Sequence, residues 1–419
     1  MTTSVEALQG RIIKVFNHGK VCLLQIAAES KKISALMSKE QTEDYKALCQ
    51  RIKLGTYIRG NGYWQEGKKT DKEFVFLNLD YISENFLTKN ETGFVSESPF
   101  NIDTFKKKYH SYLCVDSLCA TNLACRSKML FAIRHFLENR GYAEVNTPIL
   151  NKNFYAGGAQ PFLTHMLDSG SDMYMRITSE IALKMVVGGG FPKVFEIGSS
   201  FRNGSVKSKY LTPFNCAEIY TTFISEEDNL NMAEAIIKSI EKEISPIIKE
   251  NGFESIISFD GKIPRISFDE YYFTKTGQQF NWDNYMTDES TYKDESNAVY
   301  KQLKNDLFKD QVEPIFITDL PAGNSPLISC KSEKILYRSY LVANKATLME
   351  IAIGETDPEQ ILKKMERQSF NDDYKRDYSN FIHAFKMGMP PIGSIFIGID
   401  RVIPAFLGIE NLNDLSMSL

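Results

Sequence analysis

The segment VFEIGSSFRNGSVKSKYLTPFNCAEIY, residues 194–220, has the pattern of a long β-hairpin. It begins with a β-rich run, continues through a polar loop with two lysines, and ends in a second β-rich run that starts at Phe214. Arg202 follows the first strand, where a guanidinium can make two parallel hydrogen bonds to a phosphate or a carboxylate. Phe214 can stack on a flat ring. Glu218 and Tyr220 are two residues apart and therefore point to the same face of their strand.

A cation, a stacking ring and an acid on one hairpin suit a nucleotide and an amino acid that are held side by side. An ordinary surface hairpin has the same residue types, however, and a short motif of this kind is weak support by itself. Features elsewhere in the sequence are needed to distinguish a binding site from a surface hairpin.

Composition places the chain among soluble globular proteins. Hydrophobic residues make up 43% and charged residues 24% of the chain, which is usual for that class. Its 419 residues exceed the size of one ordinary core, so the length predicts two or three domains. The net charge of −4 argues against a globally basic nucleic-acid binder and leaves room for a local basic surface.

Targeting and redox signals predict a cytoplasmic protein. The sequence has no apolar run long enough to span a bilayer, and its first residues lack the basic-then-apolar pattern of a signal peptide. Seven cysteines, an odd number without CxxC spacing, predict reduced thiols. The five histidines do not cluster, which argues against a zinc site.

Residues 8–88 predict a small closed β-barrel of the OB type. Five short β-rich runs alternate with turn residues, and a helical segment, 43–51, lies in the middle. Such barrels often bind single-stranded nucleic acid through basic and aromatic side chains on one face. The candidates for that role are Arg11, Lys20, Arg59, Tyr63 and Trp64. The alternative is a barrel that only packs against its neighbour.

A polar stretch, 89–122, is typical of a linker, and the remainder of the chain mixes helices and strands. Apolar residues at helical spacing predict a helix at 124–140, which Gly141 can end. The run AEVNTPIL, 143–150, predicts a strand, and Pro148 places it at an edge or an interface. The other expected elements are helices at 229–248, 295–308 and 358–368 and strands at 315–321, 335–342 and 347–355.

Three further segments have features of a binding site. Gly157-Gly158-Ala159 is a flexible turn that lets the backbone approach a ligand. Residues 173–189 predict a strand followed by a short helix that begins near Glu180. Residues 388–408 predict an apolar strand that continues into a helix with Arg401 in its first turn. A helix N-terminus attracts anions, and an arginine there adds a charge-assisted contact to phosphate.

Three of these pieces resemble, in order, the three motifs of class II aminoacyl-tRNA synthetases: the proline-containing strand, the FRN…F…E hairpin and the terminal Gly-Ile-Asp-Arg strand and helix. The chain is most similar to the lysyl enzymes of the aspartyl/asparaginyl/lysyl subgroup, over nearly its whole length from Gly10. The resemblance implies an α+β protein with an OB-type, anticodon-binding-like domain at 1–105 and a linker at 106–122. It implies a catalytic domain at 123–419, in which helices flank an antiparallel sheet.

The resemblance also implies roles for individual residues. Arg202 and Arg401 would be the catalytic cations on the phosphates of ATP, and Glu350 would bind Mg²⁺. The implied sets are, for ATP, Arg202, Asn203, Phe214, Glu350 and Arg401; for the amino acid, Gly158, Glu180, Glu218, Tyr220 and Asp357; and for RNA, Arg11, Gln25 and Glu73. The implied cofactors are ATP and Mg²⁺, the implied substrates are a lysine-like amino acid and tRNA, and the implied assembly is a homodimer with Pro148 at its interface.

The implied reaction fits these residue types. The carboxylate of the amino acid attacks the α-phosphate of ATP, and pyrophosphate leaves. Positioning and charge neutralisation by arginines and Mg²⁺ suffice for this step, without a covalent protein nucleophile. A buried acid such as Glu218 would also reject apolar amino acids, which would leave the acid unpaired.

The sequence departs from the family pattern at several positions. At the nucleotide, Gly204 replaces a glutamate and Tyr210 replaces a histidine. The magnesium hairpin has no earlier acid at 340–343. At the other sites, the lysine enzymes have Asn, Phe and Glu where this chain has Ile353, Glu355 and Asp357, and an anticodon-stacking aromatic where it has Val21. Asp357 keeps a carboxylate at the place of that glutamate, on a side chain that is one methylene shorter.

These departures leave three functions open. The first is adenylation of lysine or a related cationic amino acid followed by transfer to tRNA. The second keeps adenylation in a divergent paralogue and changes the acceptor to a protein, a peptide or a small molecule. The third is a catalytically inactive regulator that binds RNA or an amino acid.

Overall fold

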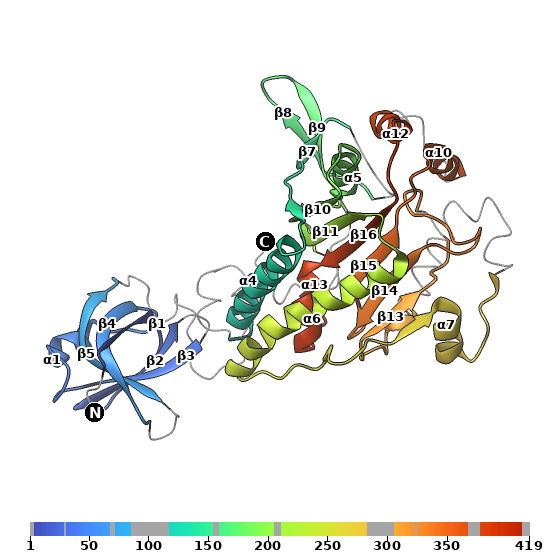
Figure 1. The fold of residues 1–419 in the computed structure, drawn as a ribbon. Helices are drawn as coiled ribbons and strands as arrows, with labels where there is room; N and C mark the ends of the chain where they lie inside the picture. The colour runs from blue at the N-terminus through green and yellow to red at the C-terminus, as the bar shows by residue number, and fades with distance from the viewer. Residues whose placement is uncertain are drawn as a thin grey trace. The chain divides into compact units, whose positions relative to one another are not determined.

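The computed structural model describes residues 4–28, 31–67, 72–84, 117–153, 159–204, 211–282, 306–322, 325–367 and 378–412. Contacts divide the chain into two compact units. One is a β-barrel built from the N-terminal strands, and the other is a larger unit that combines a sheet with helices (Figure 1). The predicted α+β organisation is therefore confirmed.

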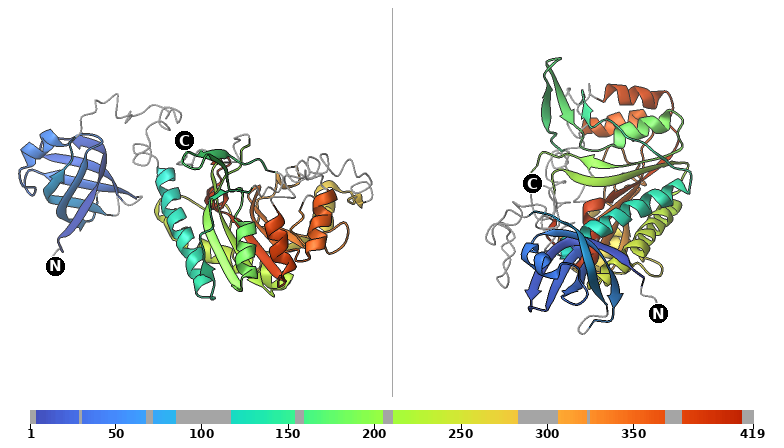
Figure 2. Two further views of the ribbon diagram at one scale, coloured as in Figure 1. Left: turned by 90° about the horizontal axis from the view of Figure 1, so that it is seen from above. Right: turned by 90° about the vertical axis from the view of Figure 1, so that its left-hand side faces the viewer.

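Five strands form a closed barrel (Figure 2). The short helix α1 (Tyr45–Arg51) lies between the third and fourth strands, close to its predicted position. A five-stranded closed barrel with one such helix is an OB-type barrel. In the order in which they pair, its strands are β1 (Glu6–Asn17), β2 (Val21–Ala28), β3 (Lys31–Ser38), β5 (Glu73–Ile82) and β4 (Tyr57–Gln65), which returns to β1.

Apolar side chains fill the barrel at alternate positions of its strands. Along β2 the buried residues are Cys22, Leu24 and Ile26, the period of two that is expected when one face of a strand is inside. Glycine is needed where two strands pass closest, because a Cβ at Gly62 would lie 1.9 Å from the carbonyl oxygen of Val75. Barrel closure thus depends on an absent side chain as well as on apolar ones.

The larger unit is organised around an eight-stranded sheet. Its central strands pair antiparallel, and the pairs at its two edges, β6 with β10 and β12 with β13, are parallel. In spatial order the strands are β12 (Arg265–Ser267), β13 (Ile315–Thr318), β14 (Arg338–Ala343), β15 (Ala346–Ile353), β16 (Ile392–Gly398), β11 (Phe214–Thr222), β10 (Lys193–Ser200) and β6 (Ala143–Glu144). The predicted hairpin of β10 and β11 thus lies inside the sheet.

Helices cover both faces of this sheet. On one face, Tyr220 packs with Leu183 and Val187 of α5 (Glu180–Gly188). On the other face, the neighbouring Thr221 hydrogen-bonds to Tyr142, whose hydroxyl also reaches Met232 of α6 (Glu226–Glu250). Helix α13 (Ile399–Leu407) continues directly from β16 and packs on β11 and β15.

Two more helices, α10 (Pro358–Arg367) and α12 (Ser379–Lys386), lie beside α5 (Figure 1). They share an apolar cluster with α5, which includes Ile181, Ile361 and Phe381. A helix near 358–368 was expected from the sequence, whereas α12 was not. Helix α4 (Ser117–Glu138) agrees with the predicted helix at 124–140, and Gly141 follows it with φ +78°, as expected for a helix-ending glycine.

Some elements differ from the prediction. The run 143–150 is not one strand, because it forms only β6 and the first residue of β7 (Leu150–Asn151) on either side of Pro148. Proline cannot donate to a strand ladder, which explains the break. Strand β7 instead joins a small sheet with β9 (Ser171–Met175) and β8 (Leu163–Met166), which stands out from the rest of the unit (Figure 1). Helix α7 (Phe268–Thr276) was not predicted, and 295–305 lie outside the described residues.

Within the described ranges, none of the helices combines the length and the apolar character that a bilayer crossing requires.

Candidate active site

A row of side chains crosses one face of the large sheet. Register partners in neighbouring antiparallel strands point to the same side. Glu218 on β11 is opposite Glu196 on β10 and Phe396 on β16. Phe396 is in turn opposite Glu350 on β15, and Glu350 is opposite Tyr340 on β14. The sheet therefore places Glu218 and Glu350, two predicted site residues that are far apart in the sequence, on one face.

Glu218 is a buried carboxylate, only 3% exposed. Its Oε1 accepts hydrogen bonds from the Thr178 hydroxyl (2.8 Å) and the Ser179 backbone N–H (3.1 Å), and its Oε2 accepts one from the Tyr220 hydroxyl (3.2 Å). Burial, and then the charge of Glu180, raises the pKa of Glu218 above its ordinary value. The hydrogen bonds to Oε1 oppose that shift. The result is an oriented acid in a low-dielectric position, where a bound cation interacts strongly.

Tyr220 remains a neutral hydrogen-bond donor. Burial, and then the nearby charges of Glu180 and Glu218, raises the pKa of Tyr220 well above its ordinary value. Its hydroxyl therefore stays protonated and orients the Glu218 carboxylate.

Glu180 starts helix α5 and pairs with a lysine one turn later. The Glu180 Oε1 lies 2.7 Å from the Nζ of Lys184, a helical i,i+4 pair. The same ammonium donates to the carbonyl oxygen of Leu327 (3.1 Å). The Glu180 side chain is 29% exposed and that of Lys184 is 1% exposed, so a ligand can reach the acid without reaching the lysine.

A buried ion pair lies next to Glu218, on the neighbouring strand β10. Arg176, just after β9, pairs with Glu196 of β10, and the two side chains are 5% and 4% exposed. Arg176 also donates to the carbonyl oxygens of Ser199 (2.9 Å) and Thr147 (3.2 Å). The Thr147 hydroxyl donates to Glu196 (2.6 Å). The pair therefore fixes the segment that leads to α5 against β10 and the region of Pro148.

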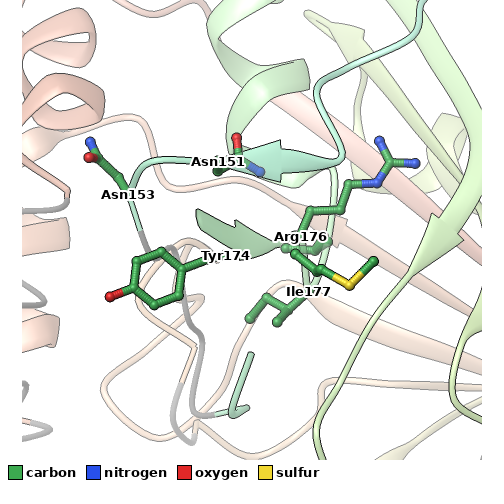
Figure 3. Close-up of a pocket in the computed structure, with 7 residues that line it drawn as sticks. Asn151, Asn153, Tyr174, Arg176 and Ile177 are labelled. Atoms are coloured by element: carbon green, nitrogen blue, oxygen red, sulfur yellow. The ribbon is translucent and has the colours of Figure 1, made fainter. Parts of the chain in front are cut away.

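A small polar pocket lies beside this ion pair (Figure 3). Asn151, Asn153 and residues 174–178 line it. Tyr174 and Asn153 extend to one side of the pocket, and the guanidinium of Arg176 points the opposite way (Figure 3). The arginine thus serves the buried ion pair.

The hairpin end carries the residues predicted for a nucleotide. The Cζ of Arg202 is 4.9 Å from the centre of the Phe214 ring, within cation–π range. The backbone N–H of Asn215, next to Phe214, donates to the carboxylate of Asp400 (2.6 Å). Because Asp400 precedes Arg401 at the start of α13, this bond brings the first turn of α13 to the beginning of β11.

Arg401 is partly buried, and its Nη1 donates to the carbonyl oxygen of Thr347 (3.2 Å). Arg202 is exposed. Two arginines, an aromatic ring and a helix N-terminus at one end of the site are suited to a polyphosphate and a base. The acid row at Glu218 is suited to a cationic group.

Glu350 is paired within its own hairpin. Its Oε1 accepts hydrogen bonds from Nε (2.9 Å) and Nη2 (2.7 Å) of Arg338. Within the described hairpin of β14 and β15, Glu350 is the only carboxylate, and Tyr340 occupies the register position opposite it. Over the described residues, no three Asp, Glu, His or Cys side chains form a group that could hold a metal ion.

Glu355 and Asp357 are engaged by neighbouring groups. The Oε2 of Glu355 lies 2.7 Å from the Nζ of Lys364. The Oδ1 of Asp357 accepts the backbone N–H of Glu359 (2.8 Å) and caps α10. Asp357 is exposed, so in this conformation its carboxylate serves the helix.

Comparison with known proteins identifies the family. A model described as class II tRNA synthetases (D, K and N) matches residues 103–417. The chain belongs to this class II synthetase family. A lysine–tRNA ligase of Prochlorococcus marinus (strain MIT 9515) is 27% identical over 97% of this chain and 85% of its own length. Lysine–tRNA ligases of Methanospirillum hungatei JF-1 and Thermotoga maritima are each 27% identical, over 97% and 94% of this chain and 84% and 81% of their own lengths.

As a member of this family, the chain is a ligase that forms an aminoacyl-adenylate. The family uses ATP, typically with Mg²⁺. Mg²⁺ is commonly bound through one or two carboxylates together with phosphate oxygens of the substrate. Glu350 fits such a partly substrate-held ion, because only its Oε1 is engaged by Arg338. A bound Mg²⁺ would there neutralise phosphate charge.

Other predicted site residues are placed less completely. Gly158, expected to contact the amino acid, and Tyr210 lie outside the described residues. The Asn203 backbone N–H donates to the carbonyl oxygen of Gln160 (2.8 Å), which ties the hairpin end to the segment after Gly158. Gly204 is exposed, and a Cβ there would meet nothing within 4 Å. Space alone therefore does not explain the glycine.

The residues predicted to bind RNA occupy separate strands of the barrel. Arg11, on β1, donates to the carbonyl oxygen of Gly55 (2.7 Å). Gln25 is a half-buried residue of β2, and Glu73, at the start of β5, accepts a hydrogen bond from Gln65 (3.3 Å). No hydrogen bond joins these three side chains to one another in the described barrel. Among the earlier candidates, Arg59 is paired with Asp80 (3.0 Å).

Sequence reasoning missed the residues that support the predicted ones, either by direct contact or through a neighbour: Thr178, Lys184, Glu196, Arg338 and Asp400. One of them, Glu196, has a signal in the sequence. It lies opposite Glu218 in a hairpin whose two strands were predicted, and alternation along a strand tells which residues share a face. Arg338 is the partner of Glu350 in the neighbouring strand of its hairpin, whereas Asp400 reaches Asn215 from a distant segment, a contact for which the sequence has no local signal.

Proposed function

We propose that this synthetase adenylates lysine or a related cationic amino acid with ATP and Mg²⁺ and transfers it to tRNA. The observation that carries the proposal is Glu218, a buried acid that is held by Thr178, Ser179 and Tyr220 on the same sheet face as the nucleotide residues. A cationic side chain would satisfy this acid, and an apolar one would leave it unpaired. The relatives named lysine–tRNA ligases support the same substrate.

In this proposal the substrates lie along β11. The adenine stacks on Phe214, and Arg202 bridges the α-phosphate and the amino acid carboxylate. Arg401 neutralises the distal phosphates, and Glu180 receives the α-ammonium group. The cationic side chain ends at Glu218 and Tyr220. The carboxylate then attacks the α-phosphate directly, a step that needs alignment and charge neutralisation and no general base.

ATP–pyrophosphate exchange with each standard amino acid, and with cationic analogues of lysine, tests adenylation and specificity together. We expect exchange with lysine or one of its analogues and none with leucine or methionine, which match lysine in size but lack its charge. Exchange with a neutral amino acid alone would overturn the proposed specificity. Exchange with no amino acid would overturn the proposed function.

Transfer to tRNA is tested separately, by charging of bulk tRNA with the amino acid that supports exchange. We expect charging by the full chain and a large loss of charging, with exchange retained, when Arg11, Gln25 and Glu73 are replaced together by alanine. Exchange without charging of any tRNA would show that the acceptor is another molecule, such as a protein, a peptide or a metabolite.

We also propose that the synthetase acts as a homodimer. The small sheet of β7, β9 and β8, which begins two residues after Pro148, exposes Leu163 of β8 (61% exposed), and the turn after β8 exposes Leu167 (93% exposed). Exposed apolar residues that gather in one place are typical of interaction surfaces. A second copy of this chain is the proposed partner, and sedimentation measures it directly.

A further inference from the structure

We propose that Lys184 is a positioning residue of the amino acid site: its buried ammonium holds the Glu180 carboxylate toward the substrate and offsets the charge that Glu180 adds beside Glu218. The inference rests on the proposed role of Glu180 in binding the α-ammonium group. Lys184 itself is buried, so a ligand in the site does not contact it.

Lys184 is a completely buried cation. Its side chain is 1% exposed, lies 2.7 Å from Glu180 and donates to the Leu327 carbonyl oxygen (3.1 Å). Burial of a lysine ammonium costs free energy unless a counter-ion and hydrogen bonds compensate for the lost water. An exposed i,i+4 pair would contribute little, so the burial of this ammonium indicates a more specific role than helix stabilisation.

The ammonium joins three segments around the site. Glu180 belongs to the first turn of α5, and Leu327 belongs to the segment before β14. The Leu327 carbonyl oxygen also accepts the backbone N–H of Glu355 (2.9 Å). Gly354, next to Glu355, lies beside the ammonium: a Cβ there would be in van der Waals contact with the Lys184 Nζ, at 3.6 Å. Through the Leu327 carbonyl oxygen, which accepts from both, Lys184 therefore links α5 with the turn that leads from β15 to α10.

The electrostatic role follows from the two acids. The charge of Glu180 raises the pKa of Glu218, so the two carboxylates interact. Tyr220 is neutral and contributes a hydrogen bond rather than a charge. Lys184 is the cation that pairs with Glu180, and its loss leaves the repulsion between Glu180 and Glu218 without compensation. A carboxylate without its counter-ion also loses its fixed orientation, which a bound α-ammonium group requires.

The test is the Lys184→Met variant of the full chain, assayed by ATP–pyrophosphate exchange with the amino acid that the unaltered protein uses. We expect the KM for the amino acid to rise at least tenfold, while the KM for ATP stays within twofold. A merely structural role would affect both substrates or neither. Lys238→Met is the matched control, because Lys238 makes an i,i+4 pair of the same length with Glu234 in α6.

A double-mutant comparison covers the case in which Lys184→Met does not fold. In Lys184→Gln combined with Glu180→Gln, the buried pair becomes neutral and can still form hydrogen bonds. If Lys184 acts through Glu180, the double variant has the same amino acid KM as Glu180→Gln alone, within about twofold. A KM for the double variant that is much higher than for Glu180→Gln, or an unchanged amino acid KM in Lys184→Met, would overturn the inference.

These outcomes are separable from failure of the proposed function. Absence of exchange in the unaltered protein refutes adenylation itself. Normal exchange in the unaltered protein together with an unaffected Lys184→Met variant refutes only the role of Lys184.

Discussion

At the scale of single residues, Glu218 shows how the site obtains its selectivity. A carboxylate in water has no preferred orientation, whereas Glu218 has one oxygen fixed by Thr178 and Ser179 and the other by Tyr220. This arrangement is costly when no cation is present, because the acid is buried. The cost is what makes the acid selective, since only a cationic ligand removes it.

Replacement of Glu218 by glutamine should therefore remove most of the activity. Loss of one partner in a buried charged pair typically costs about 2–5 kcal/mol, a fall in kcat/KM of roughly 30-fold or more. The expected loss is in kcat/KM for the amino acid, measured by exchange at varied amino acid concentration. The variant Glu241→Gln, in α6, is the control for the same chemical change at a half-buried carboxylate that accepts the backbone N–H of Phe259 (3.1 Å). A change of less than threefold in Glu218→Gln would contradict the assignment.

The same residue predicts a pH dependence of stability. Burial raises the pKa of Glu218 in the folded state, so the folded protein binds this proton more tightly than the unfolded chain. Stability from this group is therefore fully present below its unfolded pKa and is lost as the pH rises through its folded pKa. Glu218→Gln should be more stable than the unaltered protein at pH 8, and the difference should shrink towards pH 4. Chemical denaturation of both proteins across this pH range measures the difference in their free energies of unfolding. A difference that grows towards pH 4 would refute the prediction.

Arg202 is the residue on which phosphate binding should depend. Its guanidinium lies over Phe214, and a fork of two donors suits the α-phosphate better than a point charge does. We expect Arg202→Ala to lower exchange about 10²–10³-fold, the usual effect of removing one donor to transition-state charge. Arg202→Lys should recover only part of this loss, because it keeps the charge and loses the fork. Full activity in Arg202→Ala would exclude the proposed role.

At the scale of elements, the important contacts link segments that the chain separates. The Arg176–Glu196 pair joins the end of β9, strand β10 and the region of Thr147. The Asn215–Asp400 bond joins β11 to the start of α13. The Asn215–Asp400 bond lies next to Phe214 and Arg401 in the sequence, so it positions two site residues without itself meeting a ligand.

Replacement of Glu196 by glutamine tests the first of these contacts. It would leave the Arg176 guanidinium buried without a counter-ion, which typically costs about 3–5 kcal/mol of stability. Urea denaturation, followed by tryptophan fluorescence and circular dichroism, should show this loss. The double variant Arg176→Met with Glu196→Leu should regain much of it, because apolar pairs of similar volume often replace buried ion pairs. A loss below about 1 kcal/mol in Glu196→Gln would contradict the structural role.

At the scale of the whole molecule, the proposed RNA binding and the proposed adenylation belong to two different compact units. The barrel has the architecture of OB-type nucleic-acid binders, and the sheet unit holds the row of acids and the arginines. The small sheet of β7, β9 and β8 stands out from the larger unit (Figure 1) and exposes apolar residues.

The dimer prediction belongs to this scale. Leu163→Asp combined with Leu167→Asp should convert the protein from dimer to monomer in analytical ultracentrifugation, because charges would replace the apolar contact. Phe273→Asp is the control, since Phe273 is 55% exposed on α7, away from this small sheet in the sequence. A dimer that persists in the double variant, or a monomeric unaltered protein, would refute this interface.

The sequence by itself determined the barrel, the β10–β11 hairpin and the strand–helix unit of β16 and α13. These elements have local signals: alternating apolar residues, turn residues and glycines at helix ends. The hairpin also placed Glu218 and Tyr220 on one face correctly, because strand parity is a local property. The break at Pro148 follows from the chemistry of proline, although the sequence pattern had suggested one continuous strand.

Only the tertiary structure decided what surrounds these residues. Lys184 in a helix pattern has the appearance of a solvated lysine, and burial against Leu327 and Gly354 reveals its pairing with Glu180. Asp357 is predicted in the amino acid site, and the structure adds that its carboxylate caps α10. The physical reason is that burial and pairing of charges depend on which distant segments meet. Short-range periodicity carries no information about those meetings.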